Sequence, residues 1–297
     1  MASGTSETAY RLTGPAYPGH PIFAAGRAFD AEALRRELAA GLDPDMKEYD
    51  WSSTTLLHDA VLLEHWSAPP IHDFRIPERL ECIAVLLEAG ASVDKLVYGA
   101  TPLHRAVGDI YAPPEYHAVI AALVEAGADV NYADYSGSVL ARAAGAGTAA
   151  AVKTLISAGA VDFDRALKSA IIRGKQRKAG GLRICTLLLR AGAALPAAWT
   201  GYANDHQRMA CAYIERVRAA GGFKAYEKAH RQRLVAIYTP KFPHLPTDML
   251  GRVLEFSYNV GGPSIRYDLP PWTNHLPTDT LGRVLEFSSI HSAVAYL

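Results

Sequence analysis

Two histidines stand at the same place in two related hexapeptides, and their side chains are the first candidates for chemistry. His58 lies in TLLHDA (Thr55–Ala60), and His104 lies in TPLHRA (Thr101–Ala106). An imidazole can transfer a proton near neutral pH or bind a metal ion. Each of these two can instead form a structural hydrogen bond to the adjoining turn, and this is the role that we predict for both.

Other patterns typical of catalysis do not occur in the sequence. It has no His-Glu-x-x-His, no nucleophile elbow, and no paired carboxylates that a recognisable scaffold would bring together. We therefore predict that the protein is not an enzyme and that it binds no cofactor or metal ion.

Two glycine-containing stretches have partial nucleotide-binding motifs. GAGTAA (Gly145–Ala150) fits a loosened dinucleotide fingerprint, but that motif needs a preceding strand and the helix-like VLARAA precedes it here. GTAAAVKT (Gly147–Thr154) lacks the glycine before Lys153 that a phosphate-binding loop requires. We interpret this segment as a turn between two helices.

The cysteines do not form a pattern for a disulfide or a metal site. They are widely separated, none forms a CxxC pair, and each lies in an apolar helical pattern. A buried, reduced thiol is the expected state of such residues. They are Cys82, Cys185 and Cys211.

The charges balance, which bears on the classes of partner. Lys and Arg total 30 and Asp and Glu total 30 in 297 residues, so no bulk charge favours nucleic acid or an acidic membrane surface. The first residues have no apolar signal core, and no apolar run reaches membrane-spanning length. We expect a soluble cytoplasmic protein, with the nucleus as the alternative, that binds neither nucleic acid nor membrane.

A short ending similar to LLEAGA recurs along the chain and indicates internal repeats. The glycine of this ending recurs at Gly127, Gly159 and Gly192, at spacings of 32 and 33 residues. Periods of this length are typical of proteins built from stacked supersecondary units. The loop glycines of the units are Gly41, Gly90, Gly127, Gly159 and Gly192.

The residues of one unit predict two helices and a turn. Thr101 can cap the first helix, and Pro102 suits its first position, where no N–H partner is needed. Leu103 then lies on the apolar face, and Gly127 follows the second helix as a left-handed cap. Such a unit cannot bury its apolar face alone, so stacking must supply the core.

TPLHRA followed by LVEAGADVN closely resembles the ankyrin repeat, a pair of antiparallel helices with a hairpin-like turn. The resemblance covers about residues 21–194 in five units, and it implies an all-α solenoid whose histidines are structural. It also implies a non-enzymatic scaffold that binds a protein partner. The signature positions are Thr55, His58, Gly90, Thr101, Pro102, Leu103, His104, Gly127, Gly159 and Gly192.

The rest of the chain divides around this array. We expect a disordered tail over residues 1–20, and a degenerate repeat with a helical hairpin cap over 195–239. The cap consists of helices over Asp205–Ala219 and Phe223–Tyr238, separated by Gly221 and Gly222.

Three units carry insertions between their two helices. The offset from capping residue to loop glycine is 21 in the fourth unit, but 35, 26 and 27 in the second, third and fifth, counted from Thr55, Thr101 and Arg165. The first two insertions combine aromatic residues with Pro-Pro, and the third is basic. They form either a binding edge or loops that pack on the flank of the array.

Candidate partner-binding residues come from two places. The insertions contribute Trp66, Phe74, Tyr111 and Tyr116. Ankyrin proteins more usually bind through the hairpin tips and the first helices, which here implies Tyr98, Arg105, Tyr132 and Tyr135.

The C-terminal region repeats one short helix-like segment. HLPTDMLGRVLEFS (His244–Ser257) returns as HLPTDTLGRVLEFS (His275–Ser288), in the regions 240–262 and 263–297. The pattern is similar to the opening of an F-box and to a Leu-Pro element of SOCS-box adaptors. That resemblance implies an alternative function, the substrate receptor of a cullin-type ubiquitin ligase. The other interpretation is a capping helix followed by a local duplication.

Overall fold

The computed structural model describes residues 19–48, 54–63, 74–109, 112–173, 180–197 and 204–241, together with Pro243 and Thr247. The chain divides into two compact units, Met1–Cys211 and Ala212–Leu297. Trp66, Tyr111, the expected tail before residue 19 and both Leu-Pro segments beyond Thr247 lie outside the described residues.

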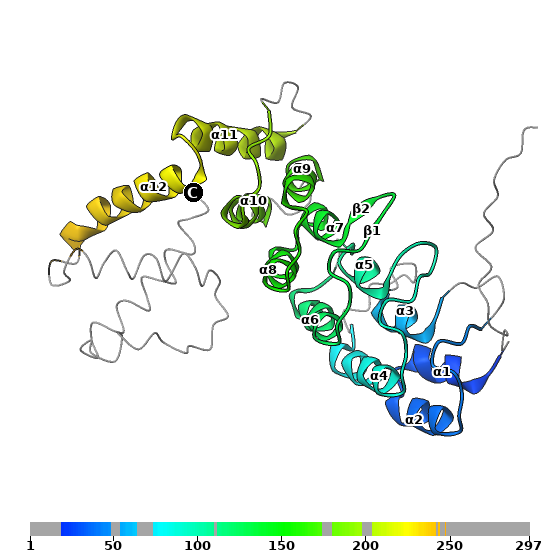
Figure 1. Cartoon of the computed structure of the whole chain (residues 1–297). Helices are drawn as coiled ribbons and strands as arrows, with labels where there is room; N and C mark the ends of the chain where they lie inside the picture. The colour runs from blue at the N-terminus through cyan, green and yellow to red at the C-terminus, as the bar shows by residue number, and fades with distance from the viewer. Residues whose placement is uncertain are drawn as a thin grey trace, which may run out of the picture. The chain divides into compact units, whose positions relative to one another are not determined.

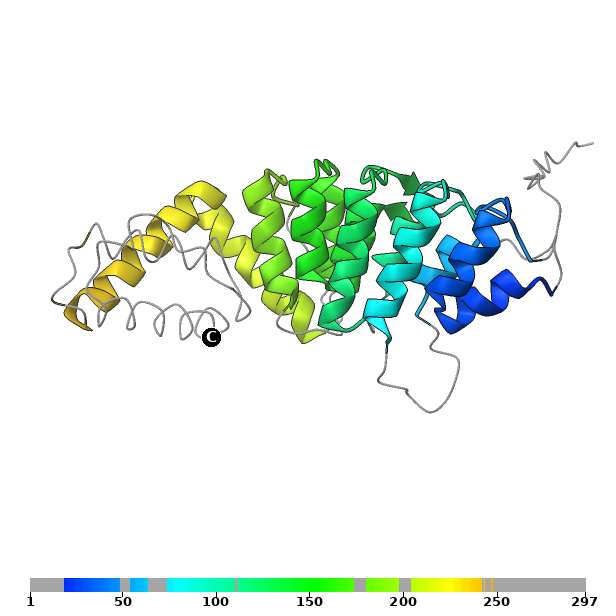
Figure 2. The same ribbon diagram turned by 90° about the horizontal axis from the view of Figure 1, so that it is seen from below.

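The first unit is a stack of helix pairs (Figures 1 and 2). The first helices α1, α3, α5, α7 and α9 contact one another in succession, and so do the second helices α2, α4, α6, α8 and α10. This arrangement confirms the predicted all-α repeat fold. The pairs are α1 (Pro21–Ala28) with α2 (Ala31–Ala39), α3 (Leu56–Val61) with α4 (Ile76–Glu88), α5 (Pro102–Ala106) with α6 (His117–Glu125), α7 (Val139–Ala146) with α8 (Ala149–Ser157), and α9 (Phe163–Arg173) with α10 (Gly180–Ala191).

The ends of these helices follow from their residues. The side chain of Thr101 accepts a hydrogen bond of 3.1 Å from the backbone N–H of His104, and Pro102 occupies the start of α5. After α6, Gly127 has φ +88°, a left-handed conformation that favours glycine. Helix α9 begins at Phe163, so Arg165, from which the offset of the fifth unit is counted as the capping position, lies inside the helix and does not cap it.

The segment with partial nucleotide-binding motifs is a helix-to-helix turn. Helix α7 ends at Ala146, Gly147 has φ +82°, and α8 begins at Ala149. The element directly before this turn is helix α7, which separates it from the strand β2 (Gly137–Ser138).

Apolar side chains between the helices form the core of the stack. Leu103 and Leu123, from the pair α5 and α6, and Leu155, from the next pair, have no exposed surface. Each pair therefore buries its apolar face against its neighbours. The three cysteines are also buried and form no disulfide, and burial raises the pKa of the Cys82 thiol to about 11.

A ladder of side-chain hydrogen bonds joins the loops of successive units. In each step an Asp or Asn side chain accepts a hydrogen bond from a backbone N–H in the loop that follows the next second helix, and Asp164 itself lies in the first turn of α9. These hydrogen bonds satisfy loop N–H groups that no helix can pair. The steps are Asp45 to Ser92 (3.1 Å), Asp94 to Asp129 (3.0 Å), Asn131 to Val161 (3.1 Å) and Asp164 to Ala194 (2.7 Å).

The end of α3 depends on residues that flank the insertions. Arg79 donates hydrogen bonds to the carbonyl groups of Ala60 and Leu62, and the hydroxyl group of Tyr116 donates to the carbonyl of Val61. These carbonyls have no partner within a helix that ends here. The 3-10 turn Pro114–Tyr116 before α6 places the tyrosine, which is only 1 % exposed. The expectation that Tyr116 offers contact area to a partner is therefore wrong, because its ring and hydroxyl group are used inside the stack.

The remaining described helices agree with the sequence in their bounds. Helix α11 (Asp205–Ala219) runs across the boundary between the two units, and α12 (Phe223–Tyr238) follows Gly221 and Gly222. The short turn Thr239–Lys241 comes next. Within the second compact unit, Ala212–Leu297, the ring centre of Tyr226 lies 5.6 Å from that of Tyr213 and 5.9 Å from that of His230. That these helices cap the array stays a prediction.

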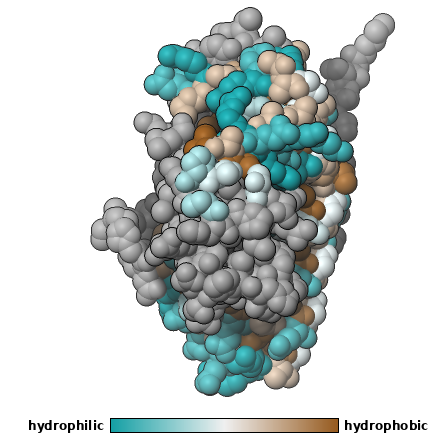
Figure 3. All heavy atoms as spheres, turned by 90° about the vertical axis from the view of Figure 1, so that its left-hand side faces the viewer, coloured by the Kyte–Doolittle hydropathy of each residue, from teal (hydrophilic) through white to brown (hydrophobic). Residues whose placement is uncertain are grey.

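None of the described helices is both long and apolar enough to cross a membrane. On the face shown in Figure 3, hydrophilic residues predominate over the described surface at the top and bottom of the view, with hydrophobic residues in small separate spots.

We predict that Tyr116→Phe lowers the free energy of unfolding by about 1–2 kcal/mol, because the buried carbonyl of Val61 loses its donor. Urea unfolding followed by circular dichroism measures this change. Tyr135→Phe is the matched control: its side chain is 92 % exposed, so we expect a change within about 0.5 kcal/mol. Equal stability of the two variants would contradict the assigned role of Tyr116.

Candidate functional site

Two neighbouring hairpins present tyrosines to solvent. In the first, Val97 and Ala100 pair across a turn in which Tyr98 has φ +50° and Gly99 has φ +70°. In the second, β1 (Ala133–Asp134) pairs antiparallel with β2, with Ala133 opposite Ser138. The side chains at the two tips are Tyr98, 66 % exposed, and Tyr135, 92 % exposed.

A carboxylate fixes the second hairpin. Asp134 accepts hydrogen bonds from the backbone N–H of Ser136 (2.7 Å), from its hydroxyl group (2.6 Å) and from the N–H of Gly137 (3.1 Å). Burial alone would raise the pKa of Asp134, but the hydrogen bonds from Ser136 and from the N–H of Gly137 outweigh it and hold the pKa below its usual range. The turn is therefore ordered before any partner binds.

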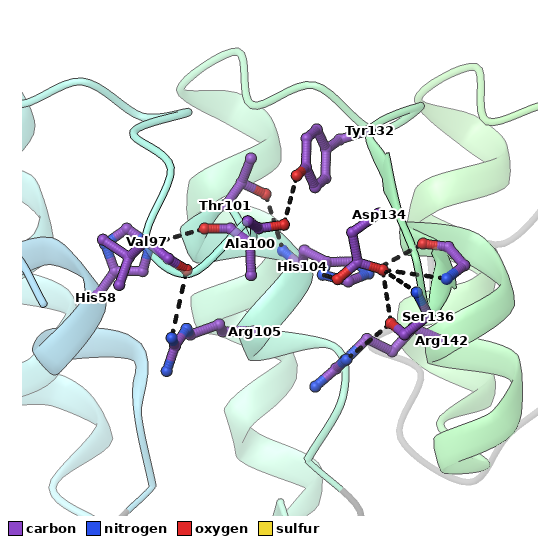
Figure 4. Close-up of polar contacts among 12 residues, drawn as sticks. His58, Val97, Ala100, Thr101, His104, Arg105, Tyr132, Asp134, Ser136 and Arg142 are labelled. Carbon is purple, nitrogen blue, oxygen red and sulfur yellow. Dashed lines mark hydrogen bonds and ion pairs between the residues drawn. The ribbon is translucent and has the colours of Figure 1, made fainter. Parts of the chain in front are cut away.

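The two histidines join each unit to the next hairpin (Figure 4). Nε2 of His58 lies 3.2 Å from the carbonyl oxygen of Ala100, and Nε2 of His104 lies 3.2 Å from that of Gly137. A carbonyl only accepts, so each Nε2 donates and carries the proton. These are the structural hydrogen bonds to the adjoining turn that the sequence predicts.

Burial keeps both imidazoles neutral. It lowers the pKa of His58 to about 4, against a smaller opposing effect of the hydrogen bond to Ala100. Burial also lowers the pKa of His104, with a further decrease from Arg142. Asp134 Oδ2 lies 3.5 Å from Nδ1 of His104, but a neutral ring forms no ion pair with it. Neither histidine has the pKa near 7 that a general base requires.

Tyr132 and Arg105 connect the two hairpins. The hydroxyl group of Tyr132 donates to the carbonyl of Gly99, and its ring meets that of His104 edge-on at 5.6 Å. Nη2 of Arg105 lies 3.4 Å from the carbonyl of Val97, and its guanidinium group lies 6.0 Å from the ring centre of Tyr98. Both side chains are half-buried.

The structure thus brings together four of the predicted partner-binding residues, Tyr98, Arg105, Tyr132 and Tyr135. Phe74 is half-buried beside α4, apart from them in the chain, and Tyr116 lies in the core. Trp66 and Tyr111 lie outside the described residues, so their role stays a prediction.

Two further side chains beside these residues were not predicted from the sequence. Leu96 is 44 % exposed next to the first hairpin, and Arg142 donates a hydrogen bond of 3.3 Å to the hydroxyl group of Ser136. Arg142 follows its capping Ser138 by four positions, as Arg105 follows Thr101, and this equal offset is a signal that could have identified it. We call the hairpin surface the set Leu96, Tyr98, Arg105, Tyr132, Tyr135 and Arg142.

The stacked helix pairs define the class of the molecule, an all-α repeat protein. Residues 98–135 match the family model of the ankyrin repeat, so the chain carries an ankyrin repeat in its third unit and in the hairpin that follows. No curated protein matches the chain. The comparisons give no support to the F-box or SOCS-box resemblance.

The exposed tyrosines on ordered hairpins offer a surface for contact with another molecule. Within the described part of the chain, no group of three or more His, Cys, Asp or Glu residues could hold a metal ion. Ankyrin repeat domains are typically non-enzymatic interaction modules.

We predict that His58 makes the fold sensitive to acid. The unfolded state binds a proton at His58 near its ordinary pKa of 6.5, and the folded state binds it only near 4. The unfolded state therefore binds more protons between these values. The stabilisation is present above pH 6.5 and is lost as the pH falls toward 4, by about 3 kcal/mol in total.

Urea unfolding at pH 7.5, 6 and 5 measures this loss. His58→Gln should be less stable at pH 7.5 and should lose less stability on acidification than the unaltered protein, because an amide does not titrate. The other buried histidines supply the remaining dependence on pH. The same loss of stability in both proteins would contradict the assignment.

Proposed function

We propose that this protein is a non-enzymatic scaffold that binds a protein partner through the hairpin surface. The observation that carries the proposal is the pair of exposed tyrosines, Tyr98 and Tyr135, on adjacent hairpins whose backbones are held by hydrogen bonds. Ankyrin repeats generally mediate protein–protein interaction, and the family match begins and ends at these two tyrosines.

The energetics of association support this surface. A tyrosine offers a large contact area with little conformational entropy to lose, and its hydroxyl group can hydrogen-bond at the rim of an interface. The hairpins are ordered beforehand by Asp134 and by the bond from Tyr132 to Gly99, which lowers the cost of binding.

The insertions are a weaker basis for a partner site. Their described apolar and aromatic residues turn inward in part: Ala112 and Tyr116 are buried and Phe74 is half-buried, whereas Pro77, Pro114 and Glu115 are exposed. The alternative that these loops pack on the flank of the array is favoured at the positions that the structure describes.

The ubiquitin-ligase receptor remains the alternative function. It rests on the sequence of His244–Ser257 alone, since only Thr247 of this segment belongs to the described residues. It predicts a cullin-type ligase component as a second partner, and the following experiment includes a variant for it.

We predict that Tyr98→Asn with Tyr135→Ala abolishes partner capture without unfolding the protein. Asparagine tolerates the left-handed backbone at position 98. Capture from lysate by the full chain, quantified by mass spectrometry, should fall about tenfold or more for the specific partners. The melting temperature should shift by less than about 2 °C, since both side chains are exposed.

The matched control replaces exposed apolar residues outside the hairpin surface, Ile172→Ala with Met209→Ala, and should capture normally. Unchanged capture of the same partners by the variant with both tyrosines replaced would contradict the proposal. A version that ends at Tyr238 tests the alternative: the selective loss of a cullin-type ligase component would favour the receptor function.

A further inference from the structure

Two arginines occupy equivalent positions on adjacent first helices of the hairpin surface. Arg105 lies on α5 and Arg142 on α7, helices that contact each other. Packed helices are about 8–10 Å apart, a separation that leaves room for a small group between two guanidinium groups. In Figure 4 both side chains extend in the same direction, away from Tyr132.

Each guanidinium group is held by its own hairpin. Arg105 donates to the carbonyl of Val97 at 3.4 Å, and Arg142 donates to the hydroxyl group of Ser136 at 3.3 Å. Arg142 also packs on the backbone at Gly108, where an added Cβ would lie 2.1 Å from its Nε atom. The two positive groups are therefore ordered without a ligand.

Their charge is not neutralised within the described part of the protein. Neither arginine forms an ion pair there, and the Nε atoms of both are buried without a hydrogen-bond partner. One oxygen of the Asp134 carboxylate, Oδ1, accepts the hydrogen bonds from Ser136 and Gly137. Burial lowers the pKa of Arg105, and the proximity of Arg142 lowers it further, whereas Asp59 opposes this effect.

We propose that Arg105 and Arg142 together bind a carboxylate group of an acidic segment in the partner protein. The inference rests on the proposed scaffold function and specifies the chemistry of what the hairpin surface binds. A guanidinium fork matches the geometry of a carboxylate, and a shared carboxylate relieves the repulsion between the two positive groups. Tyr98 and Tyr135 then contact the apolar residues that flank the acidic side chain.

The surrounding charges favour a short acidic peptide over nucleic acid. Asp59 acts electrostatically on Arg105, so negative charge borders the positive pair at this arginine. The whole chain has a formal net charge of +0. A polyanion requires an extended basic surface, whereas one carboxylate requires only the pair.

The test is a selection from a library of random peptides displayed on phage, with the full chain as bait. We expect peptides rich in Asp or Glu, and we expect replacement of those residues by Asn or Gln to weaken binding about tenfold or more. Arg105→Gln with Arg142→Gln should weaken the selected acidic peptides to the same extent. The matched control Arg36→Gln with Lys153→Gln removes the same charge from exposed positions on second helices and should bind normally.

Gly108→Ala provides a variant with unchanged charge. The added methyl group meets only the flexible end of the Arg142 side chain, so it should displace the guanidinium group and leave the fold intact. We expect weaker binding of the acidic peptides with an unchanged circular dichroism spectrum. An unchanged affinity in a folded Gly108→Ala protein would count against the pair acting together.

The remaining outcomes separate the two proposals. Selected peptides without acidic residues, bound through Tyr98 and Tyr135, would overturn the carboxylate inference and leave the scaffold function standing. Normal binding of the acidic peptides by the protein with both arginines replaced would also overturn the carboxylate inference and leave the scaffold function standing. Failure to select any peptide would count against both.

Discussion

The structure depends on one constraint: a pair of short helices has an apolar face that it cannot bury by itself. Each pair must therefore pack on the next, first helix on first helix and second on second. Polar groups reinforce this interface. Asn131 both accepts from Val161 and donates to Gly159 of the following unit, and His58 and His104 donate to the next hairpin. Stability is consequently a property of neighbouring units and not of any one of them.

The same contacts shape the surface available to a partner. His104 contributes to the interior of the stack, yet its hydrogen bond to Gly137 anchors the hairpin that carries Tyr135. The bond from Tyr132 to Gly99 holds the two hairpins side by side. Because the hairpins are fixed from within, binding needs little ordering of the backbone. The hairpins therefore present a defined surface, the one that we propose binds a partner.

The insertions show how the array tolerates additional residues. A break after α3 leaves carbonyl groups without partners, and Arg79 and Tyr116 supply the missing donors from two different units. Arg79 also stacks on Phe29, 4.3 Å from its ring centre, and so links the first helix pair (α1 and α2) to the second (α3 and α4). Polar groups at the edges of the insertions thus have structural roles at the interface between neighbouring helix pairs.

Sequence alone determined the features that depend on near neighbours in the chain. Capping by Thr101, the left-handed Gly127, the all-α repeat fold and the bounds of α11 and α12 follow from local preferences of residue types and their period. It also identified four residues of the hairpin surface. Only the tertiary structure decided that Tyr116 is buried, that Arg142 belongs beside Arg105, and that Asp and Asn side chains link the loops. These depend on contacts between different units, and spacing along one chain does not specify how an inserted loop turns or which group a side chain meets.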